Sequence, residues 1–390
     1  MTVSACFRQL RANAVVLMTA TLMIGCSAND TFEQPAQLPD VDQQVSFERV
    51  WNVTVGDGHD DEFLYLAPLN AGDVVYAASA DGELLALNAE TGKQIWENSV
   101  KDRIFAGVGG DASQLYLVSR DADLLALSRE DGSELWRASL PTEVLSAPQS
   151  NGSLVVVQTT DGRVLAFNAS DGEKRWQYDS VVPALSVRAA AAPLVGADVI
   201  ISGFANGKLL ALSTESGQPL WQYEVGAPQG RTELERLVDI TSQPLVLENT
   251  ILAVGYQGKL ALIDLRTGND IWSKAASSLY SPMVSNGNIF LASANGDLVA
   301  MRGSDRRGLW TQDKLAWRQL TQPVPFDDYL VVGDFDGYLH VVSQESGELV
   351  GQMKFDGDGI RVPAQRLSNG NLLIFGNGGK LAAYRLQSKN

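Results

Sequence analysis

The sequence repeats one pattern of about sixteen residues eight times along the chain. Three copies read DGELLALNAETGKQIW, DADLLALSREDGSELW and DGRVLAFNASDGEKRW, and they begin at Asp81, Asp121 and Asp161. The other copies begin at Asn206, Gln257, Asn295, Asp336 and, in a degenerate form, Gly378. A period of about forty residues indicates an array of equal structural units, rather than the two or three separate domains that a chain of 390 residues would otherwise suggest.

Each unit predicts a sheet of four short antiparallel strands. Asp-Gly or Asn-Gly pairs beside alternating apolar residues are the strongest short-range hairpin signal. A β-rich run such as DVVYAAS precedes each copy, and a short strand often marked by proline, as in SAPQS, precedes that run. A tryptophan ends six of the copies, each fifteen residues after its start: Trp96, Trp136, Trp176, Trp221, Trp272 and Trp310. One such sheet cannot bury both of its faces, whereas radially stacked sheets bury them against one another, so we predict an all-β β-propeller with tryptophans between its blades.

The two ends of the repeat region set the number of blades. The last copy, NGGKLAAYRLQSKN, stops before any tryptophan strand. The run SFERVWNVTV near the N-terminus is a tryptophan strand with no partner upstream. Pairing the two closes the ring with Trp51 and completes an eighth blade. We therefore predict a single domain over residues 46–390, an eight-bladed propeller with four antiparallel strands per blade.

Two positions depart from the repeat. Gly351 stands where the seventh unit would have tryptophan, and Arg306 replaces the turn glycine of the sixth. We interpret both as drift in a redundant scaffold, with functional divergence as the alternative.

The N-terminus resembles a bacterial lipoprotein signal. Arg8 and Arg11 precede the apolar run ANAVVLMTATLMIG, and small Gly25 lies directly before Cys26. We predict a signal peptide over residues 1–25, lipidation at Cys26 and a polar, proline-containing tether over residues 26–45. Ser27 rather than aspartate after the cysteine implies sorting to the outer membrane. An ordinary signal peptide or a short anchor is the alternative.

Charge argues against nucleic-acid binding. The formal net charge is −16, and no basic cluster is longer than SDRRG. Such a chain is repelled by phosphate backbones unless a basic patch offsets its charge. We predict no nucleic-acid partner.

The blade motif resembles the repeat of pyrroloquinoline-quinone dehydrogenases, which makes an enzyme the natural rival function. That motif is a packing signature and names no catalyst. The two cysteines, Cys6 and Cys26, both lie in the first 26 residues, so no free thiol is expected in the mature chain. His340 alternates with apolar neighbours in YLHVVS, which favours a structural histidine. His59 lies in the acidic loop GDGHDDE, whose spacing does not match a calcium loop, so we interpret it as part of a solvated charged loop. We predict no catalytic residue, no cofactor and no metal.

The spacing between tryptophans stretches in two places. It is 40 residues from Trp96 to Trp136 and from there to Trp176, then 45 to Trp221 and 51 to Trp272. The extra residues fall in DSVVPALSVRAAAAPL and GAPQGRTELERLVDITSQP. Since the repeat does not need these loops, function is expected there.

Both loops have the composition of a protein-binding surface. The first places Leu185 and Val187 beside Arg188, and arginine with aliphatic neighbours is typical of binding hot spots. The second contains Leu234 and Leu237 among charged residues. The alternative is that these side chains fold down and anchor the loops.

Taken together, the lipoprotein signal, the polar tether and the eight tryptophan-motif blades resemble the BamB family, the propeller lipoproteins of the outer-membrane β-barrel assembly machinery. PALSVRAAAAP is similar to the family's L-S-L-R segment, and ELERLVDITSQP to its R-L-x-D-x-D segment. The resemblance implies a non-catalytic scaffold that faces the periplasm of a Gram-negative bacterium.

The resemblance also implies a partner. In that family the two loops contact the POTRA domains of the barrel protein BamA, which assigns partner-binding roles to Leu185, Val187, Arg188, Asp239 and Thr241. Thr241 stands where the family has its second aspartate, so the electrostatic part of the contact is weakened or rearranged. Unfolded outer-membrane proteins are further expected partners, through strand addition at blade edges. A quinone-dependent dehydrogenase and a periplasmic ligand-binding propeller remain the alternative functions.

Overall fold

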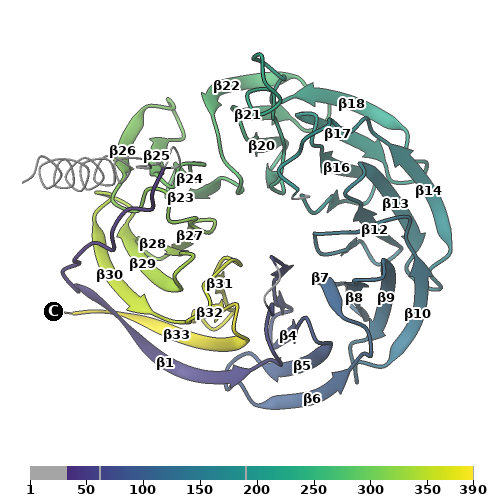
Figure 1. Ribbon diagram of the computed structural model, residues 1–390, viewed down its shortest axis with the longest axis horizontal. Coiled ribbons are helices and arrows are strands. Elements are labelled where there is room, and N and C mark those ends of the chain that lie inside the picture. The colour runs from purple at the N-terminus through teal and green to yellow at the C-terminus, as the bar shows by residue number, and fades with distance from the viewer. Residues whose placement is uncertain (1–32, 61–62, 189–190, 390) are drawn as a thin grey trace, which may run out of the picture. The chain divides into compact units, whose positions relative to one another are not determined.

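A computed structural model describes residues 33–60, 63–188 and 191–389. Its compact unit, Pro35–Asn390, is a closed ring of antiparallel sheets (Figure 1). In the described part of the chain there is no helix of the length and apolarity that crossing a membrane requires. The predicted signal peptide and the predicted lipidation site Cys26 lie outside the described residues, and the division of the chain at residues 25 and 45 stays a prediction.

The ring consists of eight blades in chain order. Blades 1 to 3 contain β3 (Leu69–Asn70), β4 (Val74–Ala78), β5 (Glu83–Asn88) and β6 (Gln94–Ser99); β7 (Ile104–Gly110), β8 (Gln114–Ser119), β9 (Asp123–Ser128) and β10 (Glu134–Ser139); and β11 (Gln149–Ser150), β12 (Leu154–Gln158), β13 (Arg163–Asn168) and β14 (Lys174–Asp179). Blades 4 to 6 contain β15 (Leu194–Val195), β16 (Val199–Gly203), β17 (Lys208–Ser213) and β18 (Pro219–Glu224); β19 (Leu245–Leu247), β20 (Thr250–Val254), β21 (Gly258–Asp264) and β22 (Asp270–Ala276); and β23 (Met283–Ser285), β24 (Asn288–Ala292), β25 (Leu298–Arg302) and β26 (Gly308–Gln312). Blades 7 and 8 contain β27 (Val324–Phe326), β28 (Tyr329–Gly333), β29 (Tyr338–Ser343) and β30 (Leu349–Lys354); and β31 (Gln365–Arg366), β32 (Leu372–Phe375), β33 (Lys380–Ser388) and β1 (Val45–Thr54). A short additional strand, β2 (Tyr65–Leu66), pairs in parallel with β7.

The eighth blade joins the two ends of the folded chain. Strand β1 pairs antiparallel with β33 from Val45 opposite Ser388 to Thr54 opposite Lys380. Trp51 of this strand is 7% exposed and belongs to the core between blades 8 and 1. The eight-bladed propeller and its closure by the N-terminal strand are therefore confirmed.

The repeated tryptophans tie each blade to the next. In six cases the indole Nε1 donates to a backbone carbonyl in the following blade at 2.8–3.0 Å: Trp51, Trp96, Trp136, Trp176, Trp221 and Trp310. Each of these rings also covers a turn glycine of that blade. A Cβ on Gly217, for example, would lie 2.5 Å from the Trp176 ring, and its φ of +69° also favours glycine. The repeated tryptophans and glycines are therefore the residues that pack each blade against the next.

The outer strand of every blade contains a β-bulge in the same place. The pairing register shifts by one residue directly before the tryptophan position, so one residue per blade has no partner. These residues are Val50, Ile95, Leu135, Arg175, Leu220, Ile271, Leu309 and Val350. A bulge bends an edge strand and interrupts its row of free hydrogen-bonding groups, which discourages pairing with another strand.

The two departures from the repeat have structural causes that the sequence did not reveal. The guanidinium of Arg306 lies 5.6 Å from the centre of the Trp272 ring, so it replaces the missing glycine contact with a cation–π contact. At the seventh tryptophan position, a Cβ on Gly351 would already lie 2.9 Å from the carbonyl oxygen of Val45. A tryptophan there would collide with the start of β1.

Candidate protein-binding surface

Two long connections between outer and inner strands form the candidate surface. The first joins β14 to β15 over residues 180–193, and the second joins β18 to β19 over residues 225–244. They belong to three successive blades, and both emerge on the side of the ring where the second strand of each blade turns into the third. The stretched tryptophan spacing therefore corresponds to two neighbouring loops.

The first loop exposes apolar side chains beside an arginine. Leu185 is 42% exposed, and Val181 and Val182 are 82% and 37% exposed. The Arg188 side chain is 67% exposed, and its Nη2 lies 2.9 Å from the Glu143 carboxylate. Leu185 and Arg188 were predicted from the sequence, but the two valines were not, because their only signal was a Val-Val pair in a loop. Together these four side chains form an amphipathic surface.

The second loop adds a further exposed leucine. Leu234 is 72% exposed and lies in a turn that begins at Thr232. The Glu235 carboxylate accepts hydrogen bonds from the backbone N–H groups of Arg231 and Thr232 at 2.6 and 3.1 Å. These bonds fix the turn that holds Leu234 outward.

Asp239 connects the two loops. Its carboxylate accepts a hydrogen bond from the backbone N–H of Val187 at 3.1 Å, and its own backbone pairs with Tyr256. The Asp239 side chain is buried, and Val187 is half-buried. The hydrogen bond between Val187 and Asp239 therefore holds the first loop in place.

Thr241 lies further along the second loop and is also turned inward. Its hydroxyl donates to the carbonyl oxygen of Leu279 at 2.7 Å, and the residue is half-buried. Of the five residues that the sequence assigned to partner binding, Leu185 and Arg188 are exposed, Val187 and Thr241 are half-buried, and Asp239 is buried.

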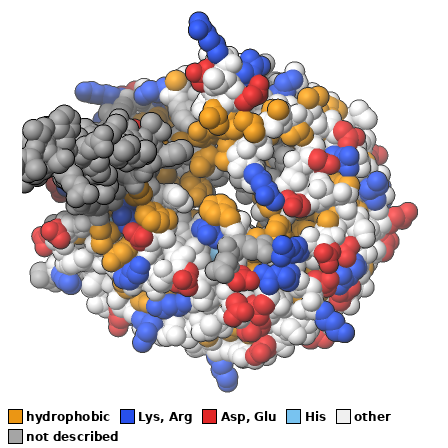
Figure 2. Space-filling model, viewed as in Figure 1, with side chains coloured by type: hydrophobic (Ala, Val, Ile, Leu, Met, Phe, Trp, Pro, Cys, Tyr) orange, Lys and Arg blue, Asp and Glu red, His pale blue; other side chains and the backbone are white. Residues whose placement is uncertain are grey.

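The loops enclose a small pocket. Val181, Val182, Ser186, Arg188, Phe204 and Asp239 contribute to its lining. Its volume is about 30 Å³, which is room for one or two water molecules. The region is therefore suited to contact with a protein surface rather than to enclosing a small molecule. Figure 2 shows hydrophobic side chains gathered beside the central opening together with several charged ones, and further charged side chains spread toward the rim.

Burial of Asp239 predicts a pH dependence of stability. Burial raises its pKa from 3.8 to about 6, against opposing hydrogen bonds from the backbone of Val187 and Ile240. Because the folded pKa is the higher one, the added stability is fully present below about pH 4 and is lost as the pH rises through about 6. Relative to Asp239→Asn, we expect the free energy of unfolding of wild type to increase by about 1–3 kcal/mol from pH 7 to pH 4, as measured by denaturant unfolding. A difference between the two proteins that does not change with pH would contradict this account.

The two histidines are structural. His340 is fully buried, and its Nε2 lies 2.9 Å from the Asp334 carboxylate. His59 is not solvated with its acidic loop: it is fully buried, its Nδ1 contacts Asn377, and burial lowers its pKa to about 4. Asp60 of that loop pairs with Arg103 at 2.6 Å. Within the described ranges, no three His, Cys, Asp or Glu side chains are grouped as a metal site would require.

The fold and this surface define a class: a β-propeller of tryptophan-motif repeats with an exposed amphipathic surface on two long loops. The sequence matches the family described as "Outer membrane protein assembly factor BamB" over residues 44–106 and 81–312. The BamB proteins of Marinobacter adhaerens and Pseudomonas aeruginosa are 73% and 44% identical to it. The alignments cover 94% and 96% of this chain, and 94% and 99% of those relatives. The chain therefore belongs to the BamB family of outer-membrane protein assembly factors.

Solved structures agree. The crystal structure of BamB from Moraxella catarrhalis superposes with a TM-score of 0.78 at 29% identity, covering 87% of this chain and all of that one. Quinohemoprotein alcohol dehydrogenase from Comamonas testosteroni has a TM-score of 0.68 at 13% identity and covers 88% of this chain and 76% of its own. At that identity the likeness concerns the propeller fold alone.

Proposed function

We propose that this chain is a non-catalytic scaffold of the outer-membrane β-barrel assembly machinery that docks on the POTRA domains of BamA through its two long loops. The observation that carries the proposal is the exposed set Val181, Leu185, Arg188 and Leu234, held on loops that Asp239 joins. Aliphatic and arginine side chains on a fixed support are the composition expected of a hot spot.

The residues divide into contacts and supports. Leu185 and Arg188 touch the partner, whereas Val187, Asp239 and Thr241 position the loops from below. An arginine in an exposed ion pair can exchange Glu143 for a carboxylate of the partner at little cost, because such a surface pair contributes less than about 1 kcal/mol. Thr241, in place of an acidic residue, supplies a hydrogen bond to Leu279 rather than a charge.

Lipidation at Cys26 is the proposed means of attachment, with the propeller in the periplasm. A multiply acylated cysteine anchors a protein stably, and one acyl chain alone does not. We propose no cofactor, because the support for quinone chemistry is a blade motif that reflects packing and a fold shared at 13% identity.

The blade rims give little support to direct capture of unfolded clients by strand addition. Each outer strand carries a bulge, although several bulged residues are apolar and exposed, such as Leu135 at 51%. Bulges interrupt the free backbone groups that an added strand needs. In this account, clients reach the barrel protein without pairing to the propeller.

Titration of the chain with BamA's POTRA domains tests the proposal. We expect wild type to bind and Arg188→Ala to bind at least about fivefold more weakly, which corresponds to about 1–4 kcal/mol, with an unchanged melting temperature. Arg302→Ala is the matched control, because Arg302 is also exposed and ion-paired, with Asp305 at 3.3 Å, but lies at the end of β25, outside the two loops. Absence of wild-type binding would overturn the docking proposal. Equal binding by the Arg188 variant would remove that residue from the contact.

A further inference from the structure

The segment that precedes the first strand lies against the propeller. Figure 1 shows it running from the start of β1 across blade 7 toward β26 of blade 6. The backbone N–H of Gln44 donates to the carbonyl of Val350, and that of Ala36 donates to the carbonyl of Ala316, both at 2.9 Å. The segment Pro35–Gln44 is therefore attached at both of its ends.

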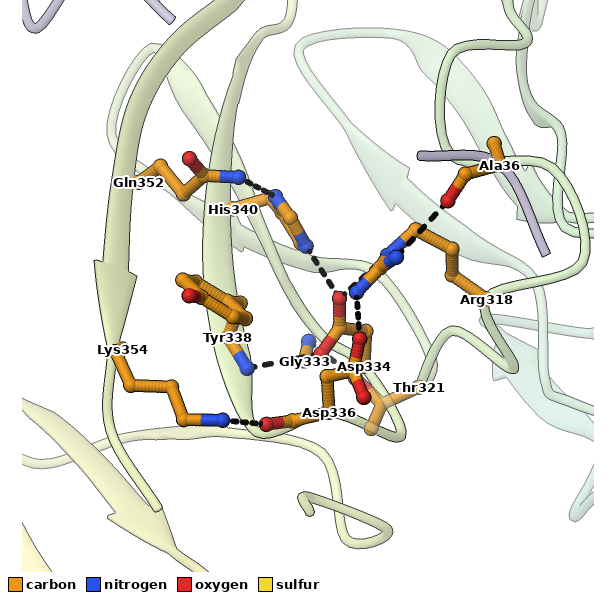
Figure 3. Close-up of polar contacts among 10 residues, drawn as sticks. All are labelled: Ala36, Arg318, Thr321, Gly333, Asp334, Asp336, Tyr338, His340, Gln352 and Lys354. Atoms are coloured by element: carbon orange, nitrogen blue, oxygen red, sulfur yellow. Dashed lines mark hydrogen bonds and ion pairs between the residues drawn. The ribbon is translucent and has the colours of Figure 1, made fainter. Parts of the chain in front are cut away.

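A buried arginine makes the attachment at Ala36. Arg318 is 3% exposed, and its Nη1 donates to the carbonyl oxygen of Ala36 at 2.9 Å (Figure 3). Its Nε donates to Asp334 at 2.8 Å and its Nη2 to Asp336 at 2.6 Å. The two carboxylates therefore offset the charge of the guanidinium, and its remaining nitrogen, Nη1, is directed at the segment.

The same cluster reaches the segment a second time. Asp334 contacts His340, whose Nδ1 lies 3.2 Å from the side-chain amide nitrogen of Gln352. The backbone N–H of Gln352 then donates to the side-chain oxygen of Gln43 at 3.1 Å. The polar cluster therefore begins at Ala36 and ends at Gln43, with fully buried Asp334 and His340 in between.

Blade 7 leaves room for the chain at the point where the segment enters β1. Gly351 lacks the side chain that would meet Val45, and Val45 is 1% exposed against Val341 and Val350. This explains why the seventh blade lacks its tryptophan. Gly351 therefore makes room for the start of β1, and Arg318 holds the far end of the segment that leads into it.

We propose that the cluster around Arg318 is a docking site for the chain's own N-terminal segment, and that it shortens the tether between the lipid and the propeller. The inference rests on the lipid anchor at Cys26 given under Proposed function. Val45 lies nineteen positions after Cys26, and Ala36 lies ten positions after it. At about 3.5 Å per extended residue, docking reduces the maximum reach from about 65 Å to about 35 Å. The junction of blades 6 and 7 is therefore the part of the ring held nearest the membrane.

Proteolysis of the full chain in detergent tests the docking itself. The Asp40 and Asp42 side chains are exposed, but a protease that cleaves at aspartate must draw the backbone around them into its own active site, so we expect cleavage there to follow release of the segment from the propeller. Ala36→Pro removes the N–H that donates to Ala316, and we expect cleavage about tenfold faster than in wild type, since one hydrogen bond is lost. Gln37→Pro is the matched control, because the backbone N–H of Gln37 donates none of the hydrogen bonds found in the described part of the chain. Cleavage of this variant at the wild-type rate is expected.

Hydrogen exchange in wild type provides a second measurement that needs no variant. The Ala36 amide is expected to exchange at least about tenfold more slowly than the Gln37 amide. Equal exchange at the two amides, or equal cleavage of wild type and Ala36→Pro, would overturn the docking. Both results are independent of the lipid.

Energy transfer to acceptor lipids tests the consequence for orientation. A dye is placed on Lys314→Cys, in the loop that receives Ala36, or on Pro141→Cys, in the corresponding loop four blades away, with the full lipidated chain on vesicles. We expect stronger transfer from position 314, and a smaller difference between the two positions when Ala36→Pro is added. Equal transfer from both positions in wild type would overturn the orientation. A chain that does not bind vesicles refutes the lipid anchor instead, while proteolysis and exchange still decide the docking.

Discussion

Replacing Asp334 with alanine is expected to lower the free energy of unfolding by about 3–5 kcal/mol, because it leaves a buried arginine without its main partner. The Asp334 carboxylate is fully buried and contacts Arg318 at 2.8 Å and His340 at 2.9 Å. It also accepts a hydrogen bond from the backbone N–H of Tyr338 at 2.8 Å. Burial by itself would raise the pKa of Asp334, but the contacts with His340, Tyr338 and Arg318 hold that pKa below its usual value.

Asp336→Ala is the matched control for this prediction. It removes the other carboxylate from the same guanidinium, at 2.6 Å, but the Asp336 side chain is 46% exposed. Water can replace an exposed partner, so a loss below about 1 kcal/mol is expected. Denaturant unfolding of the three proteins measures the difference. Equal losses for the two variants would show that burial of Asp334 does not determine the stability of the cluster.

Replacing Trp176 with alanine is expected to lower the free energy of unfolding by about 3–5 kcal/mol, the range for removing a buried aromatic ring. Trp176 is 9% exposed, donates to the carbonyl oxygen of Thr214 at 2.9 Å and covers Gly217. The substitution opens a cavity between two blades and leaves that carbonyl without its partner. Calorimetry or denaturant unfolding provides the measurement.

Trp317→Ala is the control for tryptophan removal as such. Trp317 lies in a loop, is 41% exposed and is not one of the repeated tryptophans. A loss below about 1.5 kcal/mol is expected there, because much of the ring is already in water. A loss at Trp317 as large as at Trp176 would contradict the packing role of the repeat.

The sequence predicted the architecture because the same residues carry the packing in every blade. Trp51 and the incomplete copy at Gly378 were enough to predict eight blades closed by the N-terminal strand, and the structure confirms it. What the repeat could not predict depends on contacts between residues distant in the chain. Gly351 read as drift, but it faces the backbone of Val45 about 300 residues upstream.

The composition of the candidate surface could be predicted from the sequence, but the burial of its residues could not. The unusual loop lengths pointed to Leu185 and Arg188, and both are exposed. Asp239 is buried where it contacts Val187 of the other loop, 52 residues away, and the sequence alone does not show that contact. His59 illustrates the same limit: its acidic neighbours suggested a solvated loop, whereas Asn377 and Phe375 from the last blade enclose it.

The most direct test of the central claim is to find which part of the propeller touches BamA in the assembled complex. A photo-reactive side chain is placed at Leu185, which is 42% exposed in the first loop, or at Leu135, which is 51% exposed on the outer rim. We predict a cross-link to the POTRA domains of BamA from position 185 and none from position 135. Cross-linking from the rim alone would contradict the assignment of the two loops as the docking surface.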